Sequence, residues 1–234
     1  MAVPPDPACP WPIEGSLAIQ DLSLVYFEGG PRVLMDINVH VSSKEKVGVV
    51  GRTGAGKSSL VSALFRMPEP SGKTQDPVLF GGTLKRNIDP FSQYTDQELW
   101  AALEEVQLKT LVKDLPGQLE FKLKESGTNL SVGERQLVCL ARALVQKSKI
   151  IIMDEATANV DFKTDRLIQK VIRDKFKNPT VLTIAHRLNT IMDSDKVLVL
   201  DNGRVAEFDK PEALVRKGGL FTEMVRSQKQ SVVH

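Results

Sequence analysis

Cysteine and long apolar runs are both scarce in this sequence. Cys9 and Cys139 are the only two cysteines among 234 residues. Two thiols can build neither a disulfide framework nor a cysteine-rich metal site, and they fit a reducing compartment. The longest apolar runs, such as residues 47–50 and 150–153, have the length of a strand. A membrane-spanning helix needs about 20 apolar residues, so we expect no segment of this chain to cross a membrane.

An excess of charge of one sign is also missing. The chain has 31 Lys+Arg against 29 Asp+Glu, a formal net charge of +2, without any block of five like charges. This balance gives nucleic-acid binding no electrostatic support. Residues 1–12 are rich in proline and lack both basic residues and an apolar stretch, so we do not expect them to act as a signal peptide. We interpret residues 1–15 as the end of a linker and residues 229–234 as a tail.

The remaining composition is that of an ordinary folded protein, with 41% hydrophobic and 26% charged residues. The length allows one large domain, which we place at residues 16–228. Alternation of apolar and polar residues predicts strands at 17–26 and 33–41. Continuous apolar runs that alternate with helical segments predict parallel strands covered on both faces, at 46–50, 150–153 and 180–184. The Asn202-Gly203 pair predicts a hairpin between strands at 196–200 and 204–208.

Helix starts are indicated by two capping-box patterns. Thr95 and Glu98 form the first pattern, and Ser131 and Glu134 form the second. Apolar residues at helical spacing follow both, and the segment at about 90–146 is therefore predicted to be a helical lobe. Two short helices are expected after the hairpin. The fold class that follows is α/β, with a parallel core sheet, a small antiparallel β region and a helical lobe.

A phosphate-binding loop is the firmest functional prediction. Residues 51–58 fit the pattern G-x-x-x-x-G-K-[ST] and lie between a predicted strand and a predicted helix. The backbone N–H groups of such a loop surround phosphates, Lys57 reaches the β- and γ-phosphates, and Ser58 supplies a ligand to Mg²⁺. The residues predicted to bind the phosphates are Gly51, Thr53, Gly54, Gly56, Lys57, Ser58 and Ser59.

Two carboxylates and a histidine follow predicted strands of the same sheet. Asp154 and Glu155 come after the apolar run at 150–153, and His186 comes after the run at 181–185. Open α/β sheets bind ligands at the carboxyl ends of their strands. We predict that Asp154 holds Mg²⁺, that Glu155 polarises the attacking water, and that His186 contacts the γ-phosphate or orients Glu155. Without the phosphate-binding loop, helix capping would be the more usual explanation of the two carboxylates.

Further segments extend the pattern beyond these residues. LSVGERQ at 130–136 resembles the ABC signature, IIIMDEATANVD at 150–161 the Walker B segment and D-loop, and TIAHRL at 183–188 the H-loop. With the phosphate-binding loop, these segments make the chain similar to an ABC transporter nucleotide-binding domain, a P-loop NTPase with a RecA-like core sheet. SVG in the signature and ATANVD in the D-loop resemble the second cassette of the multidrug-resistance-associated proteins of subfamily C.

This resemblance implies a transporter ATPase on the cytoplasmic side of a membrane. Two cassettes would pair head to tail and bind ATP and Mg²⁺ between them, and they would act with the transmembrane domains of an exporter. Tyr26 matches the aromatic residue that stacks on adenine, and Gln75 matches the Q-loop glutamine that touches Mg²⁺. Ser131 and Gly133 match signature residues that contact the γ-phosphate of the partner's site, although Ser131 also fits a capping box.

The sequence departs from this family in two respects that bear on activity. Only Lys73 and Thr74 stand between Gly72 and Gln75, where the family carries about two dozen more residues, including a core strand. Glu134 stands where glutamine is usual. An internal deletion before the Q-loop therefore leaves two hypotheses, an active ATPase or a module that binds ATP without hydrolysing it. A soluble ABC protein acting on ribosomes or DNA would have paired cassettes, which are absent from this sequence.

Overall fold

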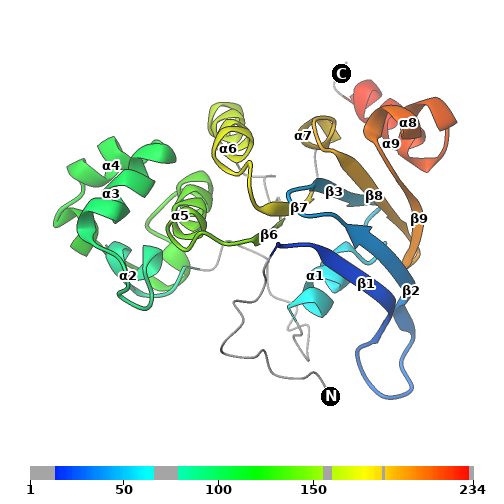
Figure 1. Ribbon diagram of the computed structural model, residues 1–234, viewed down its shortest axis with the longest axis horizontal. Coiled ribbons are helices and arrows are strands. Elements are labelled where there is room, and N and C mark those ends of the chain that lie inside the picture. Colours follow the sequence, from blue (N-terminus) through cyan, green and yellow to red (C-terminus); the bar gives the residue numbers. More distant parts are fainter. Residues whose placement is uncertain (1–13, 66–78, 155–159, 186–187, 232–234) are drawn as a thin grey trace. The chain divides into compact units, whose positions relative to one another are not determined.

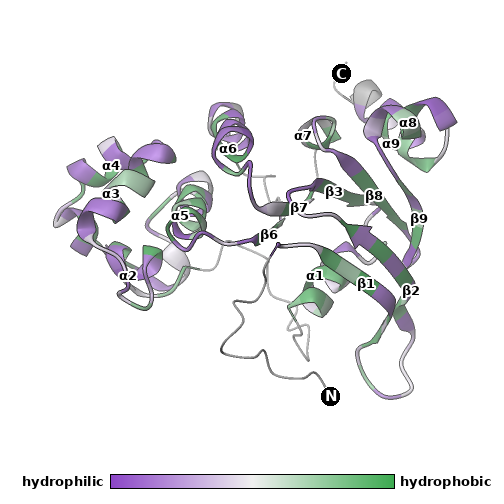
Figure 2. Ribbon diagram, in the orientation of Figure 1, coloured by the Kyte–Doolittle hydropathy of each residue, from purple (hydrophilic) through white to green (hydrophobic). Residues whose placement is uncertain are grey.

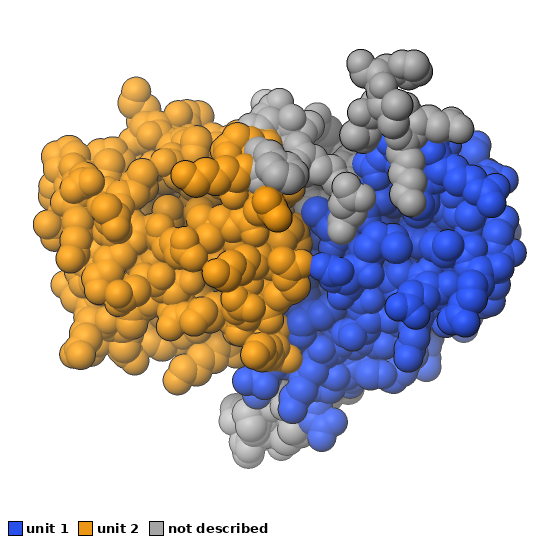
Figure 3. Space-filling model, turned by 90° about the horizontal axis from the view of Figure 1, so that it is seen from above, with its two compact units in different colours: residues 1–72, 149–153, 178–234 blue, residues 73–148, 154–177 orange. Residues whose placement is uncertain are grey.

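The computed structural model describes residues 14–65, 79–154, 160–185 and 188–231. The chain divides into two compact units, residues 1–72, 149–153 and 178–234, and residues 73–148 and 154–177 (Figure 3). The first unit contains most of the β-strands, and the second unit is mainly helical.

The first unit begins with an antiparallel strand pair, β1 (Leu17–Val25) and β2 (Arg32–Val41). Apolar and polar residues alternate along both strands, which places one face of the pair against the core (Figure 2). The separate five-stranded sheet has the strand order β6-β7-β3-β8-β9. Its strands are β3 (Lys46–Gly51), β6 (Ile150–Asp154), β7 (Thr180–Ile184), β8 (Lys196–Asp201) and β9 (Arg204–Asp209).

Strand directions in this sheet follow the predicted pattern. Strand β3 pairs in parallel with β7 and β8, whereas β8 and β9 form the antiparallel hairpin around Asn202-Gly203 (Figure 1). Both faces are covered, as the continuous apolar runs predict. Leu198 and Leu200 belong to one buried cluster with β1, β2 and α1 (Lys57–Leu64), and Val197 and Val199 belong to another. That second cluster includes residues of α7 (Leu188–Ile191), α8 (Pro211–Lys217) and α9 (Leu220–Ser231).

Strand β6 has one neighbour among the described strands, β7. Its residues are mostly half-buried, whereas those of β3 and β8 are mostly fully buried. The sequence Ile-Ile-Ile-Met is typical of a strand covered on both sides. The segment in which we predict a deletion, residues 72–75, lies outside the described residues.

The second unit consists of helices with two short strands. Its elements are β4 (Gly82–Thr83), α2 (Leu84–Ile88), α3 (Asp96–Glu105), α4 (Lys109–Asp114), β5 (Lys122–Leu123), α5 (Val132–Val145) and α6 (Phe162–Lys175). Helices α3 and α6 both pack against α5. Both predicted capping boxes are present, at Thr95 with Glu98 and at Ser131 with Glu134. Within the described residues, no helix has both the length and the apolar composition needed to cross a membrane.

Candidate functional site

The predicted phosphate-binding loop has the expected strand, loop and helix geometry. Strand β3 ends at Gly51 and helix α1 starts at Lys57 (Figure 1). Gly54 and Gly56 have φ values of +81° and +102°, a region that residues with a Cβ rarely adopt. Glycine at these positions therefore lets the chain turn sharply into the helix.

The phosphate-binding loop carries positive charge where it enters α1. The Lys57 ammonium group donates hydrogen bonds to the carbonyl oxygens of Gly51 at 2.7 Å and Arg52 at 3.1 Å. Helix α1 has no acidic residue in its first turn and no side-chain cap, so its N–H groups keep their partial positive charge. Thr53 and Ser58 are exposed beside them. This arrangement suits a phosphate group.

The Asn202-Gly203 turn braces the phosphate-binding loop. The Gly203 N–H donates to the Ala55 carbonyl at 3.1 Å, and the Gly203 carbonyl accepts from Met35 N–H at 2.8 Å. Sequence reasoning identifies this turn as a hairpin but misses its contact with the loop. An Asn-Gly pair is a local signal, whereas a contact between residues 55 and 203 depends on how the sheet folds.

Replacing Gly203 by alanine is expected to destabilise the first unit by at least about 2 kcal/mol more than replacing Gly218. Both glycines have a positive φ, +73° and +71°, so the two alanines carry similar backbone strain. A Cβ at Gly203 would lie 2.2 Å from the backbone carbonyl oxygen of Val33, whereas a Cβ at Gly218 meets no atom within 4 Å. Urea unfolding of the two variants measures the difference. Equal losses of stability would show that the close approach to Val33 carries no cost.

Tyr26 follows β1 and is half-buried. Its hydroxyl is hydrogen-bonded to that of Ser59, with 2.5 Å between the oxygens. The structure thus brings the predicted adenine-binding residue together with a residue of the predicted phosphate site.

The remaining predicted catalytic residues are described only in part. Asp154 ends β6, and both of its carboxylate oxygens are buried. Gln75, Glu155 and His186 lie outside the described residues. Two residues after His186, the Leu188 N–H at the start of α7 donates to the side-chain oxygen of Gln228 in α9 at 2.9 Å. Helix α9 therefore contacts the last residue of the predicted H-loop.

The signature segment forms the start of helix α5 in the second unit. Ser131 is the N-cap, and its hydroxyl accepts from the Glu134 N–H at 3.3 Å. The Glu134 carboxylate accepts from the Ser131 N–H at 2.7 Å. The capping function of Ser131 is therefore present. Glu134 lies against the positive end of its own helix, which offsets part of its charge.

Gly133 is buried where α5 meets α6. A Cβ at this position would lie 2.3 Å from Cγ2 of Thr164 and 3.4 Å from Cγ1 of Val160. Thr164 lies in the first turn of α6, where it donates its backbone N–H to the N-cap Asp161 at 3.0 Å. Hydrogen bonds from Thr164 hold the pKa of Asp161 below its usual value. Close packing thus requires glycine at 133, in addition to the predicted contact with phosphate. Sequence reasoning misses Thr164 because no local pattern marks it.

Replacing Gly133 by alanine is expected to destabilise the second unit by about 1–3 kcal/mol, because the added methyl group overlaps Thr164. Helix propensity alone would favour alanine by up to about 1 kcal/mol, so the sign of the change identifies the cause. Thr164→Ser removes the overlapping methyl group and keeps the hydroxyl. Urea unfolding should show that the double variant regains most of the lost stability. Failure of Thr164→Ser to restore it would contradict the packing explanation.

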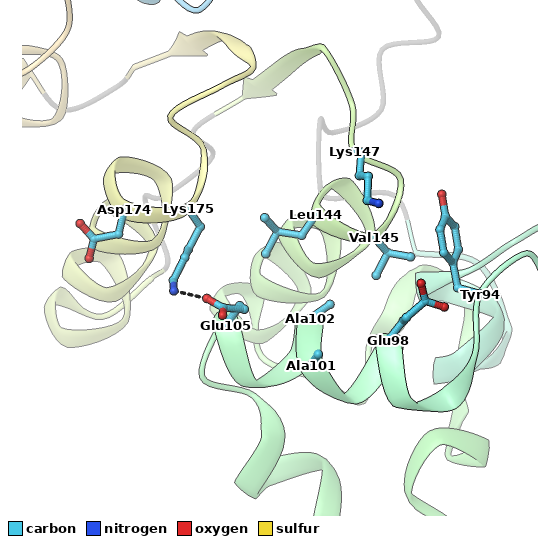
Figure 4. A pocket seen from close by; sticks show the side chains of 10 residues that line it. All are labelled: Tyr94, Glu98, Ala101, Ala102, Glu105, Leu144, Val145, Lys147, Asp174 and Lys175. Atoms are coloured by element: carbon cyan, nitrogen blue, oxygen red, sulfur yellow. Dashed lines mark ion pairs between the residues drawn. The ribbon is translucent and has the colours of Figure 1, made fainter.

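One pocket of the second unit lies away from these residues. It has a volume of about 440 Å³ and is bordered by α3, the end of α5 and the end of α6, with an ion pair between Glu105 and Lys175 (Figure 4). None of its lining residues belongs to the predicted ATP site. The described part of the chain holds no cluster of three or more His, Cys, Asp and Glu residues placed to bind a metal ion.

Comparison with known proteins relates the chain to ABC transporters of subfamily C. It is 54% identical to ATP-binding cassette sub-family C member 4 of Homo sapiens over 246 residues, which cover 95% of this chain and 18% of the relative. It is 50% identical to the probable multidrug resistance-associated protein lethal(2)03659 of Drosophila melanogaster over 232 residues, or 88% of this chain and 17% of the relative. The chain thus spans less than a fifth of the length of these relatives.

A solved structure and a family model agree with these relatives. The structure of a bacterial Atm1-family ABC exporter with ATP bound matches with a TM-score of 0.82 and 32% identity, over 92% of this chain and 42% of that chain. The family model described as ABC transporter matches residues 34–158, which include the phosphate-binding loop, the signature and Asp154. The predicted fold class is confirmed, and the chain belongs to the ABC transporter family as an ATP-binding cassette.

Proposed function

We propose that the chain binds and hydrolyses MgATP to power an exporter similar to the multidrug-resistance-associated proteins. The observation that carries this proposal is the loop between β3 and α1, where the Lys57 ammonium and the open start of α1 offer positive charge to phosphate. Family membership supports it, as does the likeness to an exporter structure with ATP bound.

Each predicted residue has a chemical part in this proposal. Lys57 exchanges the carbonyl oxygens of Gly51 and Arg52 for the β- and γ-phosphates, and Glu155 accepts a proton from the attacking water. His186 donates a hydrogen bond to the γ-phosphate or to Glu155. Tyr26 offers its ring to adenine.

Mg²⁺ fits the proposed ligands by chemistry. Ser58, Gln75 and Asp154 offer a hydroxyl, an amide and a carboxylate oxygen, which are the donors that Mg²⁺ prefers. When bound, the ion neutralises negative charge on the phosphates. Of these donors, Ser58 is exposed at the start of α1, and both carboxylate oxygens of Asp154 are buried.

The proposed partners are a second nucleotide-binding domain and the transmembrane domains of an exporter. Ser131 and Gly133 would contact ATP bound to the partner domain in a head-to-tail pair. As part of such an exporter, the chain would lie on the cytoplasmic side of a membrane. The likeness to exporters supports the proposal of both partners, and this chain matches a minor part of those proteins.

The proposed deletion before Gln75 agrees with the lengths of the alignments. The alignment with the human relative runs over 246 residues, more than the 234 residues of the whole chain. The relative therefore has residues that this chain lacks. We place them before Gln75, where a strand beside β6 would complete the sheet.

The purified chain tests the proposal through MgATP binding, measured by calorimetry, and through phosphate release, measured with and without Mg²⁺. Saturable binding with magnesium-dependent release is expected. Binding without release would instead favour a module that cannot hydrolyse ATP. A folded chain that binds neither ATP nor ADP would overturn the proposal.

A further inference from the structure

Tyr26 is anchored to the first turn of helix α1. Its hydroxyl is hydrogen-bonded to Ser59, the third residue of that helix. Ser59 is only 6% exposed, so the contact is largely shielded from water. The next residue along the chain, Phe27, is 67% exposed. Of these two neighbouring aromatic rings, Tyr26 is thus the one held by the helix that carries the phosphate-binding loop.

Anchoring affects the energy with which an aromatic ring can bind a ligand. A ring on a loop loses rotamer freedom when it stacks on a base, and this loss weakens binding. A hydrogen bond that fixes the ring in advance reduces that loss. A serine hydroxyl can accept one hydrogen bond while it donates another, so the contact with Tyr26 still leaves Ser59 able to donate to a phosphate oxygen.

We propose that Ser59 is a positioning residue for recognition of the base, because its hydroxyl holds the Tyr26 ring in place for adenine. This inference rests on the proposed function and deepens it. The contact links the base-binding side of the site to the phosphate-binding side through one pair of hydroxyl groups. It therefore favours a ligand that carries both a base and phosphates over one that carries phosphates alone.

The test compares the affinity for MgATP with that for magnesium tripolyphosphate, which has no base. Tyr26→Phe keeps the ring and removes the anchor, and it is expected to lower the ratio of the two affinities by about three- to ten-fold. Ser59→Ala should lower the same ratio to a similar extent. The double variant should have the same ratio as Ser59→Ala alone, because each substitution removes the same hydrogen bond.

Phe27→Leu provides the control, since this exposed ring lies next to Tyr26 and has no part in the proposal. It should leave the ratio unchanged, and thermal unfolding should show that all variants remain folded. The inference would be overturned if Tyr26→Phe left the ratio of the two affinities unchanged. It would also be overturned if the double variant lowered this ratio by the product of the two single effects. Either of these results would leave the proposed function intact, because the unaltered chain would still bind ATP. If the unaltered chain did not bind ATP, both the proposed function and this inference would be wrong.

Discussion

Replacement of Glu155 by glutamine is expected to lower MgATP turnover by about 10²–10⁴-fold, while MgATP affinity changes by no more than a few-fold. A carboxylate can accept the proton of the attacking water, whereas the amide of glutamine has nearly the same shape and cannot. The change therefore removes the chemistry and keeps the packing. Phosphate release under saturating MgATP measures turnover, and calorimetry measures affinity.

Glu134→Gln is the matched control for this substitution. It makes the same chemical change at a glutamate whose carboxylate accepts the Ser131 N–H in a capping box. Glutamine can replace glutamate in a capping box, so turnover should fall by no more than a few-fold below that of the unaltered chain. Full turnover in Glu155→Gln would show that another group acts as the base. Equal losses in the two variants would point to a general effect of lost negative charge.

Local sequence patterns are enough to predict many elements of this fold. The phosphate-binding loop, the two capping boxes and the Asn202-Gly203 hairpin each depend on residues close together in the chain, and the structure has all of them. Continuous apolar runs likewise locate the strands of the parallel sheet within one or two residues. These elements form where the sequence predicts them because short-range geometry and burial agree.

Contacts between distant segments are beyond such reasoning. Gly203 supports Ala55, Thr164 packs on Gly133, and Tyr26 bonds to Ser59. The two residues of each pair are at least 30 positions apart in the sequence. No local sequence pattern around either residue predicts its contact with the other. Gly133 in the signature is an example: a glycine there fits both a contact with phosphate and close helix packing, and the sequence alone does not show the packing.

Strand β6 shows where sequence and fold disagree. Its apolar residues suit a strand that is covered on both faces, yet most of them are only half-buried, and β7 is its one neighbour among the described strands. An apolar edge strand exposes unpaired backbone groups, which promotes association with other chains. This position is consistent with the proposed loss of a strand before Gln75. It also explains why the turnover of the isolated chain must be measured rather than taken from its relatives.

Replacement of Lys57 by alanine is expected to weaken MgATP binding by about 30- to 10³-fold, because it removes the ammonium group that pairs with the phosphates. In the structure that group donates to the carbonyl oxygens of Gly51 and Arg52, and bound phosphates would take over these hydrogen bonds. Calorimetric titration with MgATP measures the loss. Thermal unfolding should remain close to that of the unaltered chain, since the N–H groups of α1 and the fold of the loop stay in place.

Lys46→Ala is the matched control for this lysine. Lys46 lies at the other end of β3, where its ammonium group donates to the carbonyl oxygens of Lys44 at 3.0 Å and Pro179 at 2.9 Å. Burial lowers its pKa, partly opposed by Asp195. Removing it takes away the same charge and two similar hydrogen bonds to backbone carbonyl oxygens, at the end of β3 away from the loop, so stability should fall while MgATP affinity is kept. Equal weakening of MgATP binding in the two variants would mean that net positive charge, rather than the position of Lys57 in the loop, attracts the nucleotide.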